Sequence, residues 1–171
     1  DLTPFGVDME RLARDRLARL QAAMRTQNLA ALLLTDFLNI RYATNTVMML
    51  GLRANGIQRF ALIPAEGEPL ICQRELSHKS RYRSLRFDAY MFAMRPPVAT
   101  ADFVDQTIAG LNQLGASSER IGVDFLNLTA IDGLKSRGIS LTDGWPAINK
   151  ARAVKTADEL ALIHWTTKAK E

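Results

Sequence analysis

The sequence predicts a three-layer α/β domain with a mixed sheet of about six strands and helices on both faces. Two observations support this fold class. Apolar segments of strand length alternate along the chain with segments whose apolar residues recur every three or four positions. In addition, the turn-forming sequence Pro64-Ala-Glu-Gly-Glu-Pro69 joins the apolar segments 59–63 and 70–73. This arrangement predicts an antiparallel hairpin, which makes the sheet mixed rather than all parallel.

The first elements are predicted by a helix cap, an apolar stripe and an apolar run. Asp8 can cap a helix whose apolar residues fall on one face, namely Met9, Ala13, Leu17, Leu20 and Met24. The continuous apolar run at residues 30–35 predicts a strand covered on both sides. Asp36 is placed to cap a short helical turn that contains Asn39 and Tyr42.

The second half continues the alternation. We expect a short helix at residues 75–82 and a strand at 87–92, followed by a break at the two prolines 96 and 97. Thr100 is placed to cap the next helix, and Gly115 to end it. A strand at 120–124, a helix capped by Asn127 and closed by Gly138, and a last strand at 139–142 complete the predicted domain.

The C-terminal segment predicts the start of another helix. Thr156 and Glu159 have the spacing of a capping box, and Leu160, Ile163 and Trp165 supply apolar positions after it. No Gly, Asn or Pro follows to end this helix, and the chain begins at Asp1 rather than Met. We therefore expect a domain at residues 1–154 and, at 155–171, the start of a helix that continues in a longer protein.

Composition narrows the possible functions. The net charge is +4 and the arginines are dispersed, so we expect no nucleic-acid partner. Cys72 is the single cysteine, which excludes an internal disulfide and suits a reducing cytoplasm. No apolar run is long enough to span a bilayer, so we expect no membrane partner either.

The residues themselves indicate no catalytic centre. His78 lies three residues after Glu75, which favours a surface pair on a helix more than a metal site, and Cys72 is placed in a strand. The segment from Asp36 to Arg53 concentrates polar groups, including Tyr42, just after the first predicted strand, where α/β sheets often bind ligands. The alternative is that Asp36 is only a helix cap and Tyr42 a core aromatic with a hydrated hydroxyl.

Three segments, in this order, resemble the N-terminal domain of the creatinase, prolidase and Xaa-Pro aminopeptidase family. They are the opening helix and strand that end in Leu-Leu-Leu-Thr-Asp36, the segment Asp36-Phe-Leu-Asn-Ile-Arg-Tyr-Ala-Thr44, and the segment Arg152-Ala-Val-Lys-Thr-Ala-Asp-Glu-Leu160. The second is similar to the family pattern Asp-x-x-Asn-Ile-x-Tyr-x-Thr/Ser-Gly, although Asn45 replaces its glycine. Asn tolerates positive φ better than most residues, so the turn can survive.

The resemblance implies a fold with a ribonuclease H-like motif and a domain without catalytic residues of its own. In this family, a following pita-bread domain commonly holds two divalent metals, such as Mn, Co or Zn, and hydrolyses a C–N bond. The longer protein would then be an Xaa-Pro aminopeptidase or dipeptidase, or a creatinase-like hydrolase, acting on a small peptide or a guanidino- or amide-type substrate.

The resemblance also implies a homodimer in which this domain closes the active-site mouth of the partner subunit. Arg53 falls where creatinase-like members place an arginine that reaches the neighbouring subunit's substrate, and Asp36 and Tyr42 are the other candidate substrate-binding residues. A solvated loop arginine is the alternative for Arg53. For the whole chain, the alternative is a non-catalytic peptide- or protein-binding module, as in histone-chaperone subunits that carry the same domain.

Overall fold

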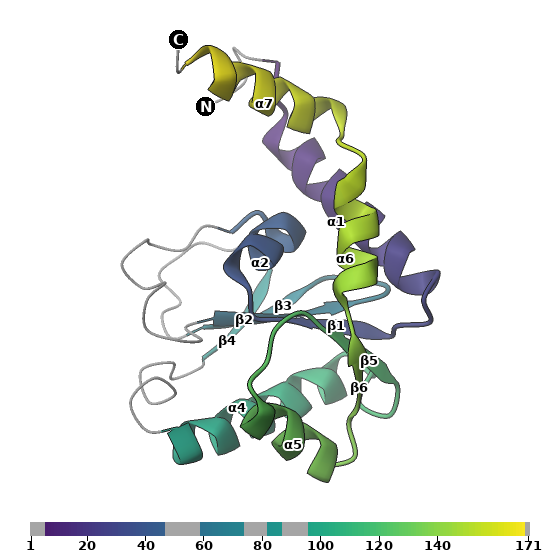
Figure 1. The fold of residues 1–171 in the computed structure, drawn as a ribbon, viewed down its shortest axis with the longest axis vertical. Coiled ribbons are helices and arrows are strands. Elements are labelled where there is room, and N and C mark those ends of the chain that lie inside the picture. The colour runs from purple at the N-terminus through teal and green to yellow at the C-terminus, as the bar shows by residue number, and fades with distance from the viewer. Residues whose placement is uncertain (1–5, 47–58, 74–81, 87–95, 170–171) are drawn as a thin grey trace.

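The computed structural model of the chain describes residues 6–46, 59–73, 82–86 and 96–169. Arg53, the predicted strand at 87–92, and all of the predicted helix at 75–82 except Tyr82 lie outside these ranges. The described residues form a mixed sheet with helices on both faces, as the sequence predicted (Figure 1). Within them, no helix is both long enough and apolar enough to cross a membrane.

The sheet has six strands in the order β4-β3-β2-β1-β5-β6. The strands are β1 (Ala31–Leu34), β2 (Arg59–Pro64), β3 (Leu70–Gln73), β4 (Arg83–Arg86), β5 (Arg120–Val123) and β6 (Ser140–Asp143). β2 pairs antiparallel with both β1 and β3, whereas the pairs β1–β5, β5–β6 and β3–β4 are parallel. The predicted hairpin is therefore β2–β3, and it is the reason that the sheet is mixed.

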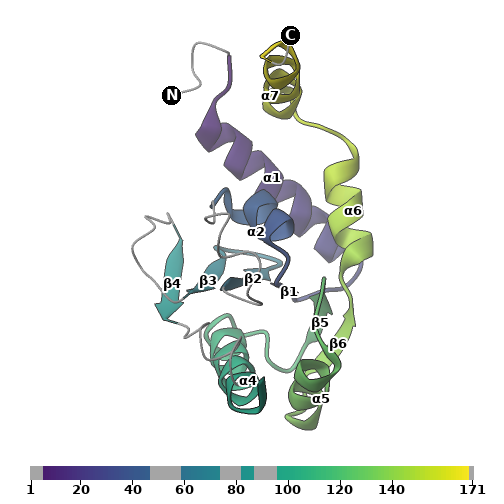
Figure 2. The same cartoon turned by 60° about the vertical axis from the view of Figure 1, so that its left-hand side comes forward.

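Helices cover the two faces in two groups, which Figures 1 and 2 show above and below the sheet. One group is α1 (Met9–Arg25), α2 (Phe37–Thr44) and α6 (Trp145–Ala153), and the other is α4 (Pro96–Gln113) and α5 (Leu128–Ser136). α7 (Ala157–Lys168) follows α6 and stands at the end of the molecule, away from the sheet (Figure 2).

Successive residues of the central strand pack into two separate hydrophobic cores, one on each face of the sheet. In β1, Leu32 and Leu34 pack with α1, α2 and α6, whereas Ala31 and Leu33 pack with α4 and α5. All four are fully buried. This follows from the alternation of side chains along a strand, and it explains why the strand reads as a continuous apolar run.

We predicted that helices begin at Asp8, Asp36, Asn127 and Thr156, and the structure confirms all four. Each of these side chains accepts at least one hydrogen bond from an N–H group of the following turn. Asn45 has φ 54° at the end of α2, so it adopts the left-handed conformation that the family's glycine would supply. The substitution at this position therefore preserves the turn.

Two helix assignments differ from the prediction. α4 begins at Pro96, not after Thr100. Proline is tolerated in the first turn of a helix, because the backbone N–H that it lacks would have no partner within the helix there. α6 was not predicted from the sequence. Its N-cap is Gly144, which offers no capping side chain, and Pro146 stands in its first turn.

Candidate functional site

Two strands of the sheet end side by side in a cluster of polar groups. β1 and β5 are parallel neighbours, so Thr35 and Asp36, which follow β1, lie next to Asp124, which follows β5. In open α/β sheets, ligands bind beyond the carboxyl ends of the strands. The surroundings of Asp124 are therefore the candidate functional site.

The Asp124 carboxylate is the acceptor at the centre of this cluster. Its Oδ1 accepts hydrogen bonds from the backbone N–H groups of Thr35 (2.9 Å) and Phe125 (2.6 Å). Its Oδ2 accepts from the backbone N–H of Asp36 (3.1 Å) and from Nδ2 of Asn39 (3.0 Å). Burial raises the pKa of Asp124 above its ordinary value, and these hydrogen bonds offset part of that rise. The side chain thus ties the ends of two strands and the start of α2 together.

Asn39 extends the cluster from the sheet to α6. Its side chain is 1% exposed, donates to Asp124, and accepts a hydrogen bond of 2.7 Å from the guanidinium of Arg152. The carboxylate of Asp36 is occupied separately, because its Oδ1 accepts from the backbone N–H groups of Leu38 (2.9 Å) and Asn39 (3.0 Å). Each of these polar side chains has a partner within the domain.

Tyr42 is buried between the same helices. Its hydroxyl donates a hydrogen bond of 2.9 Å to the backbone carbonyl of Ala151, and its side chain is buried. The guanidinium carbons of Arg16 and Arg152 lie 5.3 Å and 5.8 Å from the ring centroid, within the range of a cation–π contact. Burial, together with the nearby charge of Glu159, raises the pKa of Tyr42 to about 12, so the phenol stays protonated at neutral pH.

Of the three predicted substrate-binding residues, the structure describes Asp36 and Tyr42 but not Arg53. Asp36 is a helix cap, as the alternative interpretation expected. Tyr42 is a buried aromatic, but its hydroxyl donates to the Ala151 carbonyl, where that interpretation expected a hydrated hydroxyl. A contact of either residue with substrate stays a prediction, as does the role of Arg53, which lies outside the described residues. Sequence reasoning missed Asp124 and Arg152 as members of the cluster. The available signal for Asp124 was an acidic residue directly after an apolar strand.

Other candidates for chemistry are accounted for more simply. Cys72 lies in β3, which confirms the predicted strand, and it is fully buried. Burial raises the pKa of its thiol to about 12, so the side chain packs as a small apolar group. His164 is exposed on α7. In the part of the chain that the structure describes, no three His, Cys, Asp or Glu side chains come together to hold a metal ion.

A family model for the creatinase/prolidase N-terminal domain matches residues 16–154, which is most of the chain. The chain belongs to this family. Two curated relatives of this creatinase/prolidase N-terminal domain are dimethylsulfoniopropionate lyases (DddP) from Roseovarius nubinhibens and Roseobacter denitrificans. Each is 27% identical over 173 residues, covering 96% of this chain. The chain spans 39% of the length of these relatives.

Solved structures share the fold of this creatinase/prolidase N-terminal domain. A dipeptidase from Pyrococcus horikoshii superposes with a TM-score of 0.63 at 17% identity, over 84% of this chain and 38% of the dipeptidase. An Xaa-Pro aminopeptidase chain from Streptococcus pyogenes gives 0.57 at 18% identity, over 84% of this chain and 100% of that one. A proline dipeptidase from Streptococcus pneumoniae gives 0.58 at 21% identity, over 81% and 98%.

Proposed function

We propose that this chain is the non-catalytic N-terminal domain of a longer creatinase- or Xaa-Pro peptidase-like protein. In this proposal, bond breaking takes place in a following pita-bread domain, and residues 155–171 begin the connection to it. The domain would build a homodimer in the cytoplasm and shape the mouth of the active site. The two divalent metals that the family resemblance implies would be held in the following domain. The residues of this chain would not bind them.

One observation carries the proposal. The polar side chains at the carboxyl edge of the sheet, where a ligand would be expected, are engaged within the domain. Asp124 accepts from the ends of two strands, Asp36 caps α2, and the Tyr42 hydroxyl is bonded to a backbone carbonyl. Such a network stabilises the domain and leaves these groups little capacity for acid–base work.

The substrate of the longer protein has two candidate classes. The solved structures with the same fold include dipeptidases and an Xaa-Pro aminopeptidase, which supports a small peptide. The two lyases act on dimethylsulfoniopropionate and match this chain at 27% identity, against 17–21% for those structures. That difference supports a second candidate, a small zwitterionic substrate.

A direct assay separates the domain proposal from the choice of substrate. The purified 171-residue chain and the longer protein are each incubated with Xaa-Pro dipeptides and with dimethylsulfoniopropionate, with and without added Mn²⁺, Co²⁺ or Zn²⁺. We expect no turnover by the chain and turnover of one substrate class by the longer protein. Turnover that follows the chain through purification, and that a point substitution in the chain abolishes, would refute the proposal.

Arg53 supplies a second, more specific test in the longer protein. We propose that it contacts an anionic group of the substrate bound to the partner subunit, because a guanidinium can donate two parallel hydrogen bonds to a carboxylate. Arg53→Ala should then lower kcat/KM for an anionic substrate about ten- to a hundredfold, and Arg53→Lys should restore part of the loss. Unchanged kinetics in an intact dimer would return Arg53 to the alternative of a solvated loop residue.

A further inference from the structure

The last helix docks onto the domain in an unusual way. The buried side chains of α7 are its two acidic residues, Asp158 and Glu159, which are 2% and 6% exposed. Its apolar residues Leu160 and Ile163 are 56% and 51% exposed, and Leu162 and Trp165 are half-buried. A surface helix normally packs through its apolar stripe and exposes its charges. The attachment of α7 therefore includes charged contacts beside the half-buried Leu162 and Trp165.

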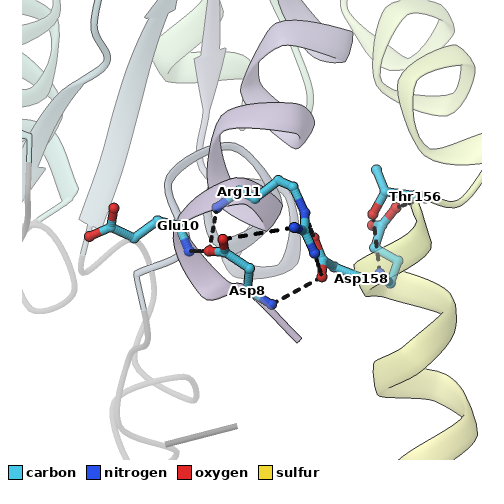
Figure 3. A network of polar contacts seen from close by, with 6 residues as sticks. Asp8, Glu10, Arg11, Thr156 and Asp158 are labelled. Atoms are coloured by element: carbon cyan, nitrogen blue, oxygen red, sulfur yellow. Dashed lines mark hydrogen bonds and ion pairs between the residues drawn. The ribbon is translucent and has the colours of Figure 1, made fainter. Parts of the chain in front are cut away.

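Asp158 makes the first contact with α1. The guanidinium of Arg11 donates two hydrogen bonds to its carboxylate, from Nε to Oδ2 at 2.8 Å and from Nη2 to Oδ1 at 2.7 Å (Figure 3). The backbone N–H of Asp8 donates a third, at 3.0 Å. A bidentate pair fixes orientation as well as distance, because the planar guanidinium matches the carboxylate at two points.

Glu159 makes the second contact, five residues (about 1.4 helical turns) further along α1. Nε of Arg16 donates a hydrogen bond of 2.8 Å to its Oε1. Its Oε2 accepts from the backbone N–H of Thr156 at 2.8 Å, which closes the capping box at the start of α7. The Arg16 and Glu159 side chains are 17% and 7% exposed, so solvent screens this pair less than a surface pair.

We propose that Arg11 and Arg16 form a two-point clamp that fixes the angle of α7 to α1. Two contacts five residues apart on α1 constrain the orientation of α7 more tightly than either contact alone. Arg16 also lies over the ring of Tyr42, which links the clamp to the cluster around Asn39 and Arg152. The clamp therefore sets the direction in which the polypeptide leaves the domain. Its consequence for a following domain rests on the proposed function, but the clamp itself does not.

Amide hydrogen exchange in the 171-residue chain tests the clamp. An isolated helix as short as α7 is marginal in water, so its amides should exchange slowly only while it is docked. Arg16→Gln should accelerate exchange across residues 162–167 about tenfold, and Arg11→Gln with Arg16→Gln about a hundredfold. Arg14→Gln is the matched control, since it removes the same charge from an exposed position of α1. Arg14 has no hydrogen bond or ion pair to α7 among the described residues, so this variant should leave α7 exchange unchanged.

The amides of β1 serve as an internal reference for the folded domain. If they remain protected while α7 exchange accelerates in the double variant, the clamp is supported. If α7 exchange is unchanged in the double variant, or already fast in the unmodified chain, the proposal is wrong. Should the double variant lose β1 protection, the single Arg16→Gln variant decides the outcome. Acceleration of α7 exchange by about tenfold in that variant then supports the clamp, and unchanged exchange overturns it.

The distance between spin labels on α1 and α7 tests the angle between these two helices independently of amide exchange. Spin labels are attached at Ala18→Cys on α1 and Lys168→Cys on α7, two exposed positions. Cys72 does not compete for the label, because it is fully buried and its thiol pKa is raised to about 12. We expect a narrow distance distribution in the labelled chain and a broad one when Arg11 and Arg16 are also replaced. Loss of activity in the longer protein tests the proposed function instead, so the two failures are distinguishable.

Discussion

Replacing Asp124 with alanine should destabilise the domain more than any other single change at the carboxyl edge of the sheet. The carboxylate accepts from three backbone N–H groups and from the side-chain amide of Asn39. Alanine has no acceptor, so all of these donors lose their partner at once. The loss affects the end of β1, the start of α2 and the turn after β5 together.

The magnitude follows from how deeply each donor is buried. Asn39 is 1% exposed, and leaving a buried donor unpaired costs about 1–3 kcal/mol. The three backbone donors are partly buried and can recover some hydrogen bonding from water, so each adds about 0.5–1 kcal/mol. We therefore expect the free energy of unfolding to fall by about 2.5–6 kcal/mol. For a chain of this length, that corresponds to a decrease in Tm of about 5–24 °C.

Urea unfolding followed by circular dichroism, with a thermal melt, measures this change. Asp105→Asn is the matched control, because Asp105 pairs with Arg137 at 2.8 Å but both side chains are more than half exposed. An exposed pair of this kind contributes about 0–1 kcal/mol. If Asp124→Ala costs no more than this control, the cluster does not hold the strand ends together and the argument from burial is wrong.

Three further predictions test other parts of the structure. The hydrogen bonds from Arg11 hold the pKa of Asp158 below 3.8, so its contribution to the docking of α7 is present above about pH 4 and is lost as the pH falls through the lowered pKa. The protection factors of the α7 amides, which correct for the intrinsic pH dependence of exchange, should therefore fall in acid, and Asp158→Asn should remove that step. Gly122→Ala should lower the free energy of unfolding by about 1–3 kcal/mol in a urea titration, since its Cβ would come within 2.6 Å of Leu32; an unchanged midpoint would contradict the packing. Tyr42→Phe should cost about 1–2 kcal/mol in the same assay, because it leaves a buried carbonyl of α6 without its donor, and a neutral result would show that the carbonyl finds another partner.

Local signals in the sequence were sufficient for much of the fold. Capping residues carry their own hydrogen-bonding geometry, so Asp8, Asp36, Asn127 and Thr156 marked helix starts correctly. The continuous apolar run at β1 correctly predicted a strand that is buried on both faces. α6 was not predicted because it lacks a capping side chain. Two of its three buried residues are alanines, so its sequence shows no clear stripe of large apolar residues.

The candidate site was predicted less completely, because its contacts join distant parts of the chain. Asp124 and Asn39 are 85 residues apart, and Tyr42 and Ala151 are 109 apart. Helix and strand periodicity relate only neighbours along the chain. The sequence placed Asp36 and Tyr42 in the correct neighbourhood. However, Asp124, which accepts from the backbone N–H of Asp36, follows β5, and Ala151, which accepts from the Tyr42 hydroxyl, lies on α6, so only the folded topology brings these partners close.

We propose that no residue of this chain takes part in the chemical step, and the kinetics of the longer protein carrying Asp36→Asn are the decisive test. Asn is nearly isosteric with Asp and also caps helices well, so α2 should keep its start and the fold should be preserved. We expect kcat to stay within about twofold of the unmodified enzyme, with any effect confined to KM. A fall in kcat of about a hundredfold or more, in a protein whose Tm is unchanged, would place Asp36 in the chemical step and contradict the account.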